Sequence, residues 1–163
     1  MEELGGTEYL KVMFDRSEGK IPVLDRKHEK QVQEFCRELI QKGLISSAHD
    51  CSEGGLAVAV AESCFSYGGE TFGATLTLES TLRNDTLLFG ETQSRIVVSF
   101  PEERIDEIED LAMAFPVDFS LIGKVGGSHY TINVNGKEVV KQEINIIKEI
   151  WKTSLGNYAG QVT

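Results

Sequence analysis

Two polar segments of this chain carry residue types that could bind an anion. The first is His49-Asp50-Cys51-Ser52-Glu53-Gly54-Gly55, which follows the apolar run 44–48 and precedes the Ala-rich run 57–62. This order predicts a strand, a glycine-rich turn and a helix. The first backbone N–H groups of a helix have no partners within it and point outwards, so such a turn can receive an anion, above all phosphate. The same residues also fit a purely structural turn, in which Ser52 is an N-cap and Gly54-Gly55 allow close packing.

The second segment, residues 88–98, holds a dense polar cluster that leads directly into an apolar strand. Glu91 and Gln93 fit polar contacts to a ligand, and Arg95 fits a phosphate because its guanidinium fork matches phosphate oxygens. The alternative for Arg95 is an internal ion pair with Glu91, which closes the turn without a ligand. The candidate nucleotide-binding or phosphate-binding residues of the two segments are Asp50, Ser52, Gly54, Gly55, Glu91, Thr92, Gln93 and Arg95.

The first turn holds three further residues whose chemistry has to be considered, Asp50, Cys51 and His49. Asp50 fits a Mg²⁺ ion or a ribose hydroxyl, and it equally fits a role in orienting the turn through its own backbone hydrogen bonds. Helix-terminal N–H groups could lower the thiol pKa of Cys51, but no suitable His–Asp pair accompanies it, so we expect no catalytic role. His49 is expected to pack at the strand end, and it lies too far in sequence from His28 and His129 to suggest a zinc site.

Composition excludes several classes of protein. The 163 residues fit one domain with a full core, and 40% apolar and 26% charged residues are typical of a soluble globular protein. A formal charge of −10, with 16 basic residues scattered among acids, argues against a nucleic-acid surface. We find neither an apolar run near the length of a membrane span nor a signal peptide, so a cytoplasmic location is expected. The three cysteines have no CxxC spacing and are predicted to be reduced.

Hydrophobic periodicity and turn residues predict the remaining elements. Asp25 is expected to cap a helix that Gly43 ends, and Asn135-Gly136 is expected to form a hairpin turn. The predicted elements are a short amphipathic piece at 4–14, a helix from 25 to 43, strands at 45–48, 72–78, 95–100 and 117–125, a helix at 53–67 ended by Gly68-Gly69, a short helix or turn at 80–89, a helix from Pro101 to Phe115, a hairpin of 130–134 and 138–140, and a last helix through 144–151.

This order predicts an α+β fold with a ferredoxin-like βαββαβ core, an added N-terminal helix and a C-terminal hairpin plus helix. In that core the third strand lies between the first and second and is antiparallel to both. The glycine turn and the Glu91–Arg95 segment should therefore meet at one edge of the sheet. We expect a linker with a short helix at 1–23, the folded domain at 24–157 and a tail at 158–163.

The two polar segments, at this order and spacing, resemble a known family. The resemblance covers almost the whole chain, through Leu4–Leu10, Ala48–Glu62, Leu87–Val98, Ile122–Val125 and Ile147–Trp151. It is to the C-terminal domain of the large subunit of phosphoribosylformylglycinamidine synthase (formylglycinamide ribonucleotide amidotransferase), an aminoimidazole ribonucleotide synthetase C-terminal-like domain. Sister enzymes of the superfamily usually carry other residues at these turns.

The resemblance implies the reaction of a complete enzyme. Formylglycinamide ribonucleotide, ammonia from glutamine and ATP would give formylglycinamidine ribonucleotide, ADP and phosphate, a ligase reaction that forms a C–N bond and depends on ATP and Mg²⁺. The implied partners are the N-terminal domains of the same full-length chain, a glutaminase subunit and a small bridging subunit. The catalytic His and most ATP and Mg²⁺ ligands of the family lie in other domains. We therefore expect this chain, which starts just before Leu4, to be an excised domain or terminal fragment that is inactive alone.

The sequence leaves three alternative functions open. The chain is a ligase domain that supplies ligand contacts, or a non-catalytic module that braces other domains or walls an auxiliary nucleotide cleft, or a stand-alone sensor of a small molecule. Val12-Met13-Phe14 and Trp151 are interpreted as core or inter-domain packing, and the segment Tyr9–Phe14 is expected to contribute to an apolar patch.

Overall fold

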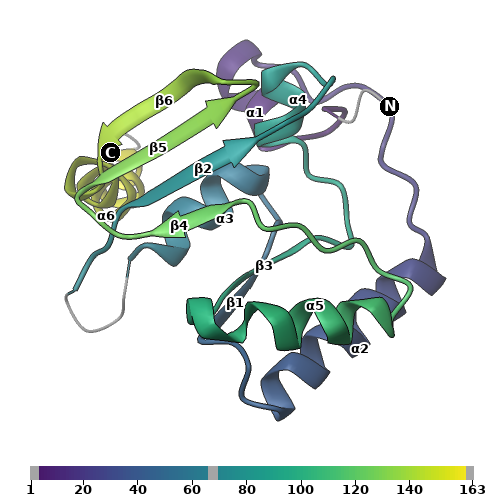
Figure 1. Cartoon of the computed structure of the whole chain (residues 1–163). Coiled ribbons are helices and arrows are strands. Elements are labelled where there is room, and N and C mark those ends of the chain that lie inside the picture. The colour runs from purple at the N-terminus through teal and green to yellow at the C-terminus, as the bar shows by residue number, and fades with distance from the viewer. Residues whose placement is uncertain (1–3, 66–69, 161–163) are drawn as a thin grey trace. The chain divides into compact units, whose positions relative to one another are not determined.

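The computed structural model describes residues 4–65 and 70–160, with helices and strands in the mixed order of an α+β protein, which confirms the predicted class (Figure 1). The chain divides into two compact units. Unit 1 comprises Met1–Val60 and Leu82–Leu121, and unit 2 comprises Ala61–Thr81 and Ile122–Thr163. The predicted helix end at Gly68-Gly69 lies outside the described residues, and the domain limits expected from sequence stay predictions.

Unit 1 begins with two helices whose starts the sequence dictates. Thr7 caps α1 (Glu8–Phe14), because its side chain accepts a hydrogen bond from the backbone N–H of Leu10. Asp25 caps α2 (Arg26–Gln41) in the same way, as predicted. At the end of α2, Gly43 has a φ of +63°, which glycine adopts without strain, and the chain turns back there.

The strands of unit 1 form a two-stranded sheet. β1 (Ser47–Asp50) pairs antiparallel with β3 (Ile96–Ser99), so that Asp50 lies opposite Ile96. The predicted antiparallel pairing of the first and third strands is thereby confirmed. The register places the glycine turn after β1 beside the polar segment that leads into β3.

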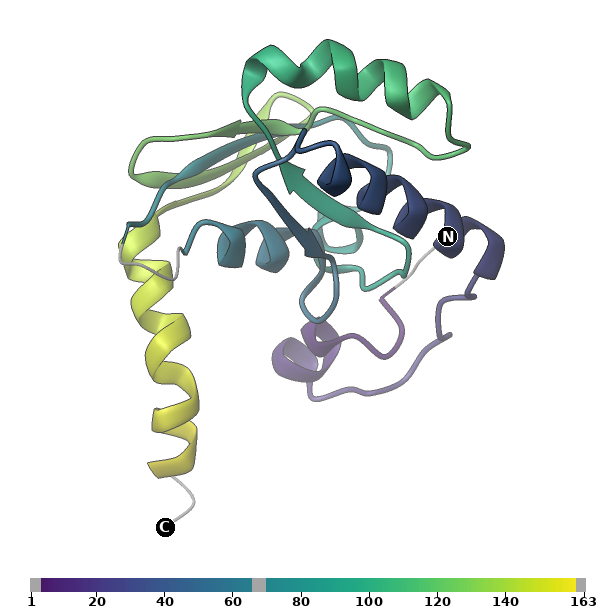
Figure 2. The ribbon, with the colours of Figure 1, turned by 90° about the horizontal axis from the view of Figure 1, so that it is seen from below.

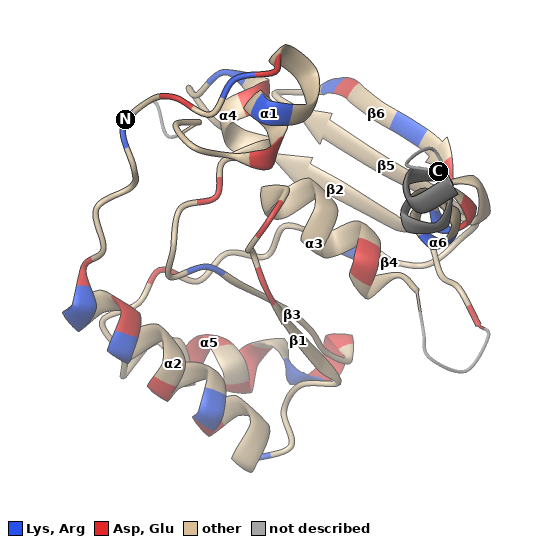
Figure 3. Cartoon of the chain, turned by 180° about the vertical axis from the view of Figure 1, so that it is seen from behind, with Lys and Arg blue, Asp and Glu red and all other residues tan. Residues whose placement is uncertain are grey.

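The core of unit 1 lies between α2 and α5 (Ile105–Met113), which follows η1 (Glu102–Arg104). Ile108 of α5 is fully buried in a cluster with Phe35, Leu39 and Leu44. The predicted apolar stripe of this helix is therefore correct. Its other positions are strongly acidic, as the red segments of α5 in Figure 3 show. The helix α4 (Asn84–Phe89) precedes the second polar segment.

Unit 2 contains a four-stranded sheet in the order β4-β2-β5-β6. Its strands are β4 (Gly123–Val125), β2 (Ala74–Leu78), β5 (His129–Val134) and β6 (Lys137–Glu143). β2 is parallel to β5 and antiparallel to β4, and β5 and β6 form the predicted hairpin. Asn135 and Gly136 have positive φ values of 50° and 74°, as a two-residue hairpin turn requires.

The last helix, α6 (Ile144–Gly160), continues directly from β6 and extends beyond the sheet (Figure 2). Ile144 is buried, whereas Ile150 and Trp151 are exposed. Trp151 packs its ring against Phe65 and donates a hydrogen bond from its indole N–H to Glu62. Among the described residues, none of the helices has both the length and the apolar character needed to cross a membrane.

The expected single βαββαβ sheet differs from the structure in its strand pairing. The second strand does not pair with the third, because β2 belongs to the four-stranded sheet and β3 to the two-stranded one. The fourth strand is also much shorter than the predicted 117–125. Val117 and Phe119 pack against the apolar cluster of α2 and α5 instead of joining a ladder, so pairing starts only at Gly123.

Candidate functional site

The glycine turn ends where α3 (Gly55–Ser63) begins. Gly54 and Gly55 have φ values of +80° and +66°, a conformation that L-residues with a side chain rarely adopt. A Cβ on Gly55 would lie 2.5 Å from the backbone oxygen of Gly90, and one on Gly54 would lie 2.5 Å from Cγ2 of Val58. The turn therefore requires glycine for its backbone conformation and for its close approach to the segment that follows α4.

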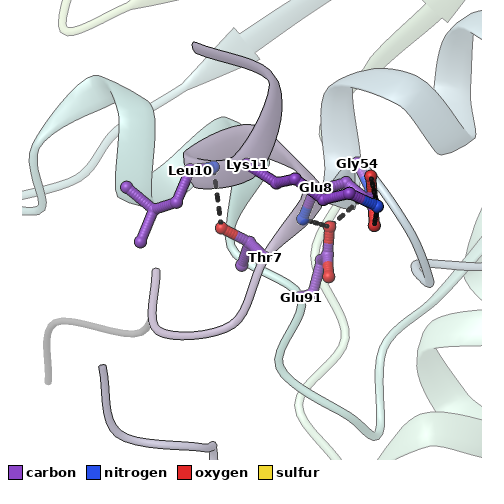
Figure 4. A network of polar contacts seen from close by, with 6 residues as sticks. All are labelled: Thr7, Glu8, Leu10, Lys11, Gly54 and Glu91. Carbon is purple, nitrogen blue, oxygen red and sulfur yellow. Dashed lines mark hydrogen bonds and ion pairs between the residues drawn. The ribbon is translucent and has the colours of Figure 1, made fainter. Parts of the chain in front are cut away.

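Glu91 joins the two polar segments (Figure 4). Its Oε1 accepts a hydrogen bond from the backbone N–H of Gly54 at 2.8 Å and another from the backbone N–H of Glu8 at 3.0 Å. Gly54 immediately precedes α3, and Glu8 is the first residue of α1. One carboxylate oxygen thus satisfies an end donor of two helices, at the positions where negative charge is favourable.

Ser52 does not act as the predicted N-cap. Its hydroxyl donates to Asp50 Oδ2 at 2.5 Å, and its backbone oxygen accepts from the N–H of Gly55 at 3.0 Å. Asp50 is exposed, and the Ser52 hydroxyl is the main cause that holds the pKa of the Asp50 carboxyl below its usual value. The contact supports the structural interpretation of Asp50, which orders the turn.

Arg95 stabilises the backbone conformation of the second segment. Its Nε donates to the backbone oxygen of Thr92 at 3.3 Å, and a second guanidinium nitrogen donates to the backbone oxygen of Gly90. Within the described residues Arg95 forms no ion pair with Glu91, so the internal pair considered as an alternative is wrong. The guanidinium thus donates to backbone carbonyls. Gln93 in the same segment is exposed.

Cys51 of the first segment contacts the second, because its backbone N–H donates to the backbone oxygen of Arg95 at 2.9 Å. Helix N–H groups could have lowered the pKa of its thiol, but the shift has the opposite direction. Burial raises the pKa of the Cys51 thiol, and the charge of Arg95 opposes this rise only in part. A buried thiol with a raised pKa is a poor nucleophile.

An open groove of about 700 Å³ runs along the two segments and the first half of α2. Four carboxylate residues line it, Glu29, Asp50, Glu53 and Glu91, against a single arginine, Arg95. The rim is therefore net negative, and a phosphate there requires a cation or donors from another protein part. The other lining residues are Leu24, Val32, Gln33, Cys51, Ser52, Gln93, Ser94 and Ile96.

Glu29 of α2 is the site residue that the sequence did not indicate. Its Oε2 accepts a hydrogen bond from the hydroxyl of Ser94 at 2.6 Å, which ties α2 to the second polar segment. Ser94 has a φ of +65°, unusual for a residue with a side chain. Nothing in the sequence indicates this contact, because Glu29 and Ser94 are 65 positions apart and no local pattern relates them.

Magnesium does not fit the described residues by themselves. Where positions can be described, no three His, Cys, Asp or Glu side chains come together as metal ligands. Asp50, the one metal candidate from sequence, accepts the Ser52 hydroxyl and belongs to no such group of three among the described residues. Because Mg²⁺ is usually bound by one or two carboxylates together with waters and phosphate oxygens, the described residues would supply only part of such a site.

The structure therefore brings together most of the residues that the sequence singled out. Glu91 and Arg95 contact the glycine turn through Gly54 and Cys51, which confirms that the two segments share one edge of the β1–β3 sheet. Ligand binding at this edge stays a prediction. The donors expected to hold a phosphate are engaged, the N–H of Gly54 by Glu91 and two guanidinium nitrogens of Arg95 by backbone carbonyls.

Known proteins resemble this chain in sequence. Phosphoribosylformylglycinamidine synthase subunit PurL of Caldanaerobacter subterraneus subsp. tengcongensis is 40% identical over 150 residues, which are 92% of this chain and 20% of that protein. The subunit PurL of Methanocaldococcus jannaschii is 37% identical over 163 residues, 99% of this chain and 22% of its own length. The chain spans about a fifth of the length of these curated relatives.

Solved structures share the fold. Thermotoga maritima PurL complexed with FGAR superposes with a TM-score of 0.69 at 22% identity, over 78% of this chain and 22% of that one. T. maritima PurL complexed with ATP gives 0.64 at 20% identity, over 72% and 21% of the two chains. PurLQS from T. maritima gives 0.66 at 21% identity, over 78% and 22%.

A sequence family covers most of the chain. The family described as AIR synthase related protein, C-terminal domain, matches residues 2–135, which include both polar segments, all of unit 1 beyond Met1 and the sheet of unit 2 as far as the hairpin turn. On this match the chain belongs to the family of AIR synthase related protein C-terminal domains.

Proposed function

We propose that this chain is the C-terminal domain of a phosphoribosylformylglycinamidine synthase large subunit, a ligase that forms a C–N bond in purine biosynthesis. The complete enzyme would convert formylglycinamide ribonucleotide, ammonia from glutamine and ATP to formylglycinamidine ribonucleotide, ADP and phosphate. The observation that carries the proposal is the alignment of 92–99% of this chain with relatives named PurL at 37–40% identity. Family membership alone supports only the domain type.

Within that enzyme the domain has a supporting role. The described residues hold no cluster for Mg²⁺, and the groove rim is net negative, so cations and phosphate donors must come from elsewhere in the enzyme. ATP and Mg²⁺ are cofactors of the full-length enzyme in this proposal, and the other domains, a glutaminase subunit and a small bridging subunit are its partners. The likeness to PurL within PurLQS supports such an assembly, and a cytoplasmic location completes the proposal.

One observation favours the second candidate function, a bracing or auxiliary nucleotide-binding module. The polar groups expected to contact a ligand satisfy the chain's own backbone, since Glu91 bonds Glu8 and Gly54, and Arg95 bonds Gly90. Such contacts stabilise the edge without any ligand. A ligand-contacting domain and a purely bracing module differ in whether the isolated chain recognises nucleotide.

A chimera tests the proposal. The matching fifth of M. jannaschii PurL is replaced by this chain, which aligns over 99% of its length, and synthase activity is assayed with formylglycinamide ribonucleotide, ammonia, ATP and Mg²⁺. We expect an active chimera and no turnover from this chain alone. A folded chimera without activity would contradict the proposal.

Titration of the chain with ATP, ADP and formylglycinamide ribonucleotide, followed by amide NMR, separates the two candidate roles. A ligand-contacting domain should show shifts confined to residues 50–55 and 91–95. A bracing module should show none at ligand concentrations that saturate the chimera.

A further inference from the structure

We propose that Glu91 is a clasp that couples the N-terminal helix α1 to the glycine turn, so that a loss of local stability in one segment also lowers the local stability of the other. The clasp consists of the Glu91 carboxylate and the two backbone N–H groups that it accepts from, those of Glu8 and Gly54 (Figure 4). It is independent of the reaction proposed above and concerns only how this chain holds its candidate site.

Among the described residues, the two donors have no other acceptor. Glu8 is the first residue of α1 and Gly54 immediately precedes α3, so neither N–H has a partner in its own helix. Within the part of the chain that the structure describes, each donates only to Oε1 of Glu91, at 3.0 Å and 2.8 Å. These segments are separated from Glu91 by 83 and 37 positions, so no local turn accounts for their contact.

The helix α1 depends on this attachment. It has seven residues, none of them buried, which is too short to be stable by itself in water. Val12, Met13 and Phe14 on it are exposed. Besides the hydrogen bond to Glu91, α1 contacts this part of the chain through Tyr9, whose ring stacks on that of Phe89 with centroids 4.8 Å apart. Phe89 ends α4 just before Gly90 and Glu91, so both attachments lead to the segment 89–91.

The glycine turn depends on the same segment. The α-carbon of Gly55 comes so close that a Cβ would lie 2.5 Å from the Gly90 oxygen and 2.9 Å from the Phe89 carbonyl carbon. The turn therefore packs directly on residues 89–91 and cannot shift towards them without moving them. Because α1 and the turn both rest on this segment, a disturbance of either one reaches the other through Glu91.

Amide hydrogen exchange of the full 163-residue chain, read residue by residue by NMR, tests the clasp. In Glu91→Ala, exchange at both Glu8 and Gly54 should rise about tenfold or more, because both protons lose their acceptor. Glu91→Gln keeps an acceptor oxygen and should change either rate by about threefold or less, since neutral hydrogen bonds are weaker but remain. Glu53→Ala is the matched control, an exposed carboxylate next to Gly54 with no hydrogen bond to it, and should leave both rates unchanged.

A second variant tests the coupling without touching the carboxylate. Thr7→Ala removes the N-cap of α1, which frays that helix. If Glu91 couples the segments, exchange at Gly54 should also rise, by about threefold, although the Thr7 side chain bonds Leu4 and Leu10 and the Gly54 N–H bonds Glu91. The proposal is overturned if Glu91→Ala alters only one of the two amides or neither, or if Thr7→Ala loosens α1 and leaves Gly54 unchanged.

Discussion

Two pairs of consecutive glycines in this chain look alike in sequence and differ in their surroundings. Gly54-Gly55 and Gly126-Gly127 all have positive φ values. A Cβ on Gly126 or Gly127 would meet nothing within 4 Å, whereas a Cβ on Gly55 would overlap the backbone at Gly90. Backbone conformation alone explains the second pair. At the first pair, close approach of two chain segments is an additional requirement, and that approach creates the candidate site.

Gly55→Ala should have the largest effect on this comparison. The new Cβ must either displace the Gly90 carbonyl or distort the start of α3, in addition to the cost of the left-handed conformation. We expect the free energy of unfolding to fall by about 4 kcal/mol, from strain and overpacking together. Chemical denaturation measures it. A fall of less than about 1.5 kcal/mol would show that the two segments have room to separate.

Ile108→Ala gives the scale for an ordinary core position of unit 1. Ile108 is fully buried in the cluster with Phe35, Leu39 and Leu44, so removing its side chain leaves a cavity. The unfolding free energy should fall by about 3 kcal/mol in chemical denaturation. Met113→Ala, at an exposed position of the same helix, is the control and should have a small effect. A loss below about 1 kcal/mol in Ile108→Ala would mean that α5 is misplaced.

Glu91→Ala removes the charge-assisted hydrogen bonds that join α1 to the glycine turn. We expect a loss of about 2 kcal/mol in unfolding free energy, because hydrogen bonds to charged groups are stronger than neutral ones. Chemical denaturation of this variant and of the control Glu53→Ala measures the two unfolding free energies, and their difference isolates the contribution of the Glu91 carboxylate. If both variants lose the same stability, the carboxylate of Glu91 has no special role.

Gly127→Ala is the counterpart of Gly55→Ala. Its φ of +72° disfavours a side chain, yet open space surrounds the position. The cost should be about 1 kcal/mol, the conformational term alone. The difference in unfolding free energy between the two alanine variants is therefore the energy of close approach at Gly55. Equal losses would remove the distinction between the two glycine pairs.

Ser52→Ala should have the smallest effect, confined to the titration of Asp50. The Ser52 hydroxyl lowers the pKa of Asp50, so its contribution to stability is present above the pKa of the unfolded state and is lost as the pH falls through the folded pKa. In the variant the pKa of Asp50 should rise towards its usual value. Carboxyl NMR titration checks this, and an unchanged midpoint would assign the shift to another cause.

Local signals in the sequence predicted the elements well. Asp25 as an N-cap, Gly43 at a helix end and the Asn135-Gly136 turn all appear in the structure, because each depends on a few neighbouring residues. The antiparallel neighbours β1 and β3 were also predicted. Whether the edge binds a nucleotide stays a prediction.

Strand partners and side-chain partners far along the chain were harder to predict. The alternation in β2 indicates one buried face and does not say which strand lies beside it, so its place in the four-stranded sheet was missed. Val117 and Phe119 have strand-like residue types, but they pack on the helical cluster of unit 1. The type of Glu91 indicates an acceptor, and only the fold shows that its acceptor sites face two backbone amides.

The most direct measurement of the central claim, that Glu91 closes the site edge, needs no variant. NMR correlations through hydrogen bonds, from the amide nitrogens of Glu8 and Gly54 to the side-chain carboxyl carbon of Glu91, detect the two contacts directly. Because Oε1 accepts from both amides, both nitrogens should correlate with this one carboxyl carbon. If either amide of the folded chain shows no such correlation, the carboxylate does not join the helix and the turn, and the account is wrong.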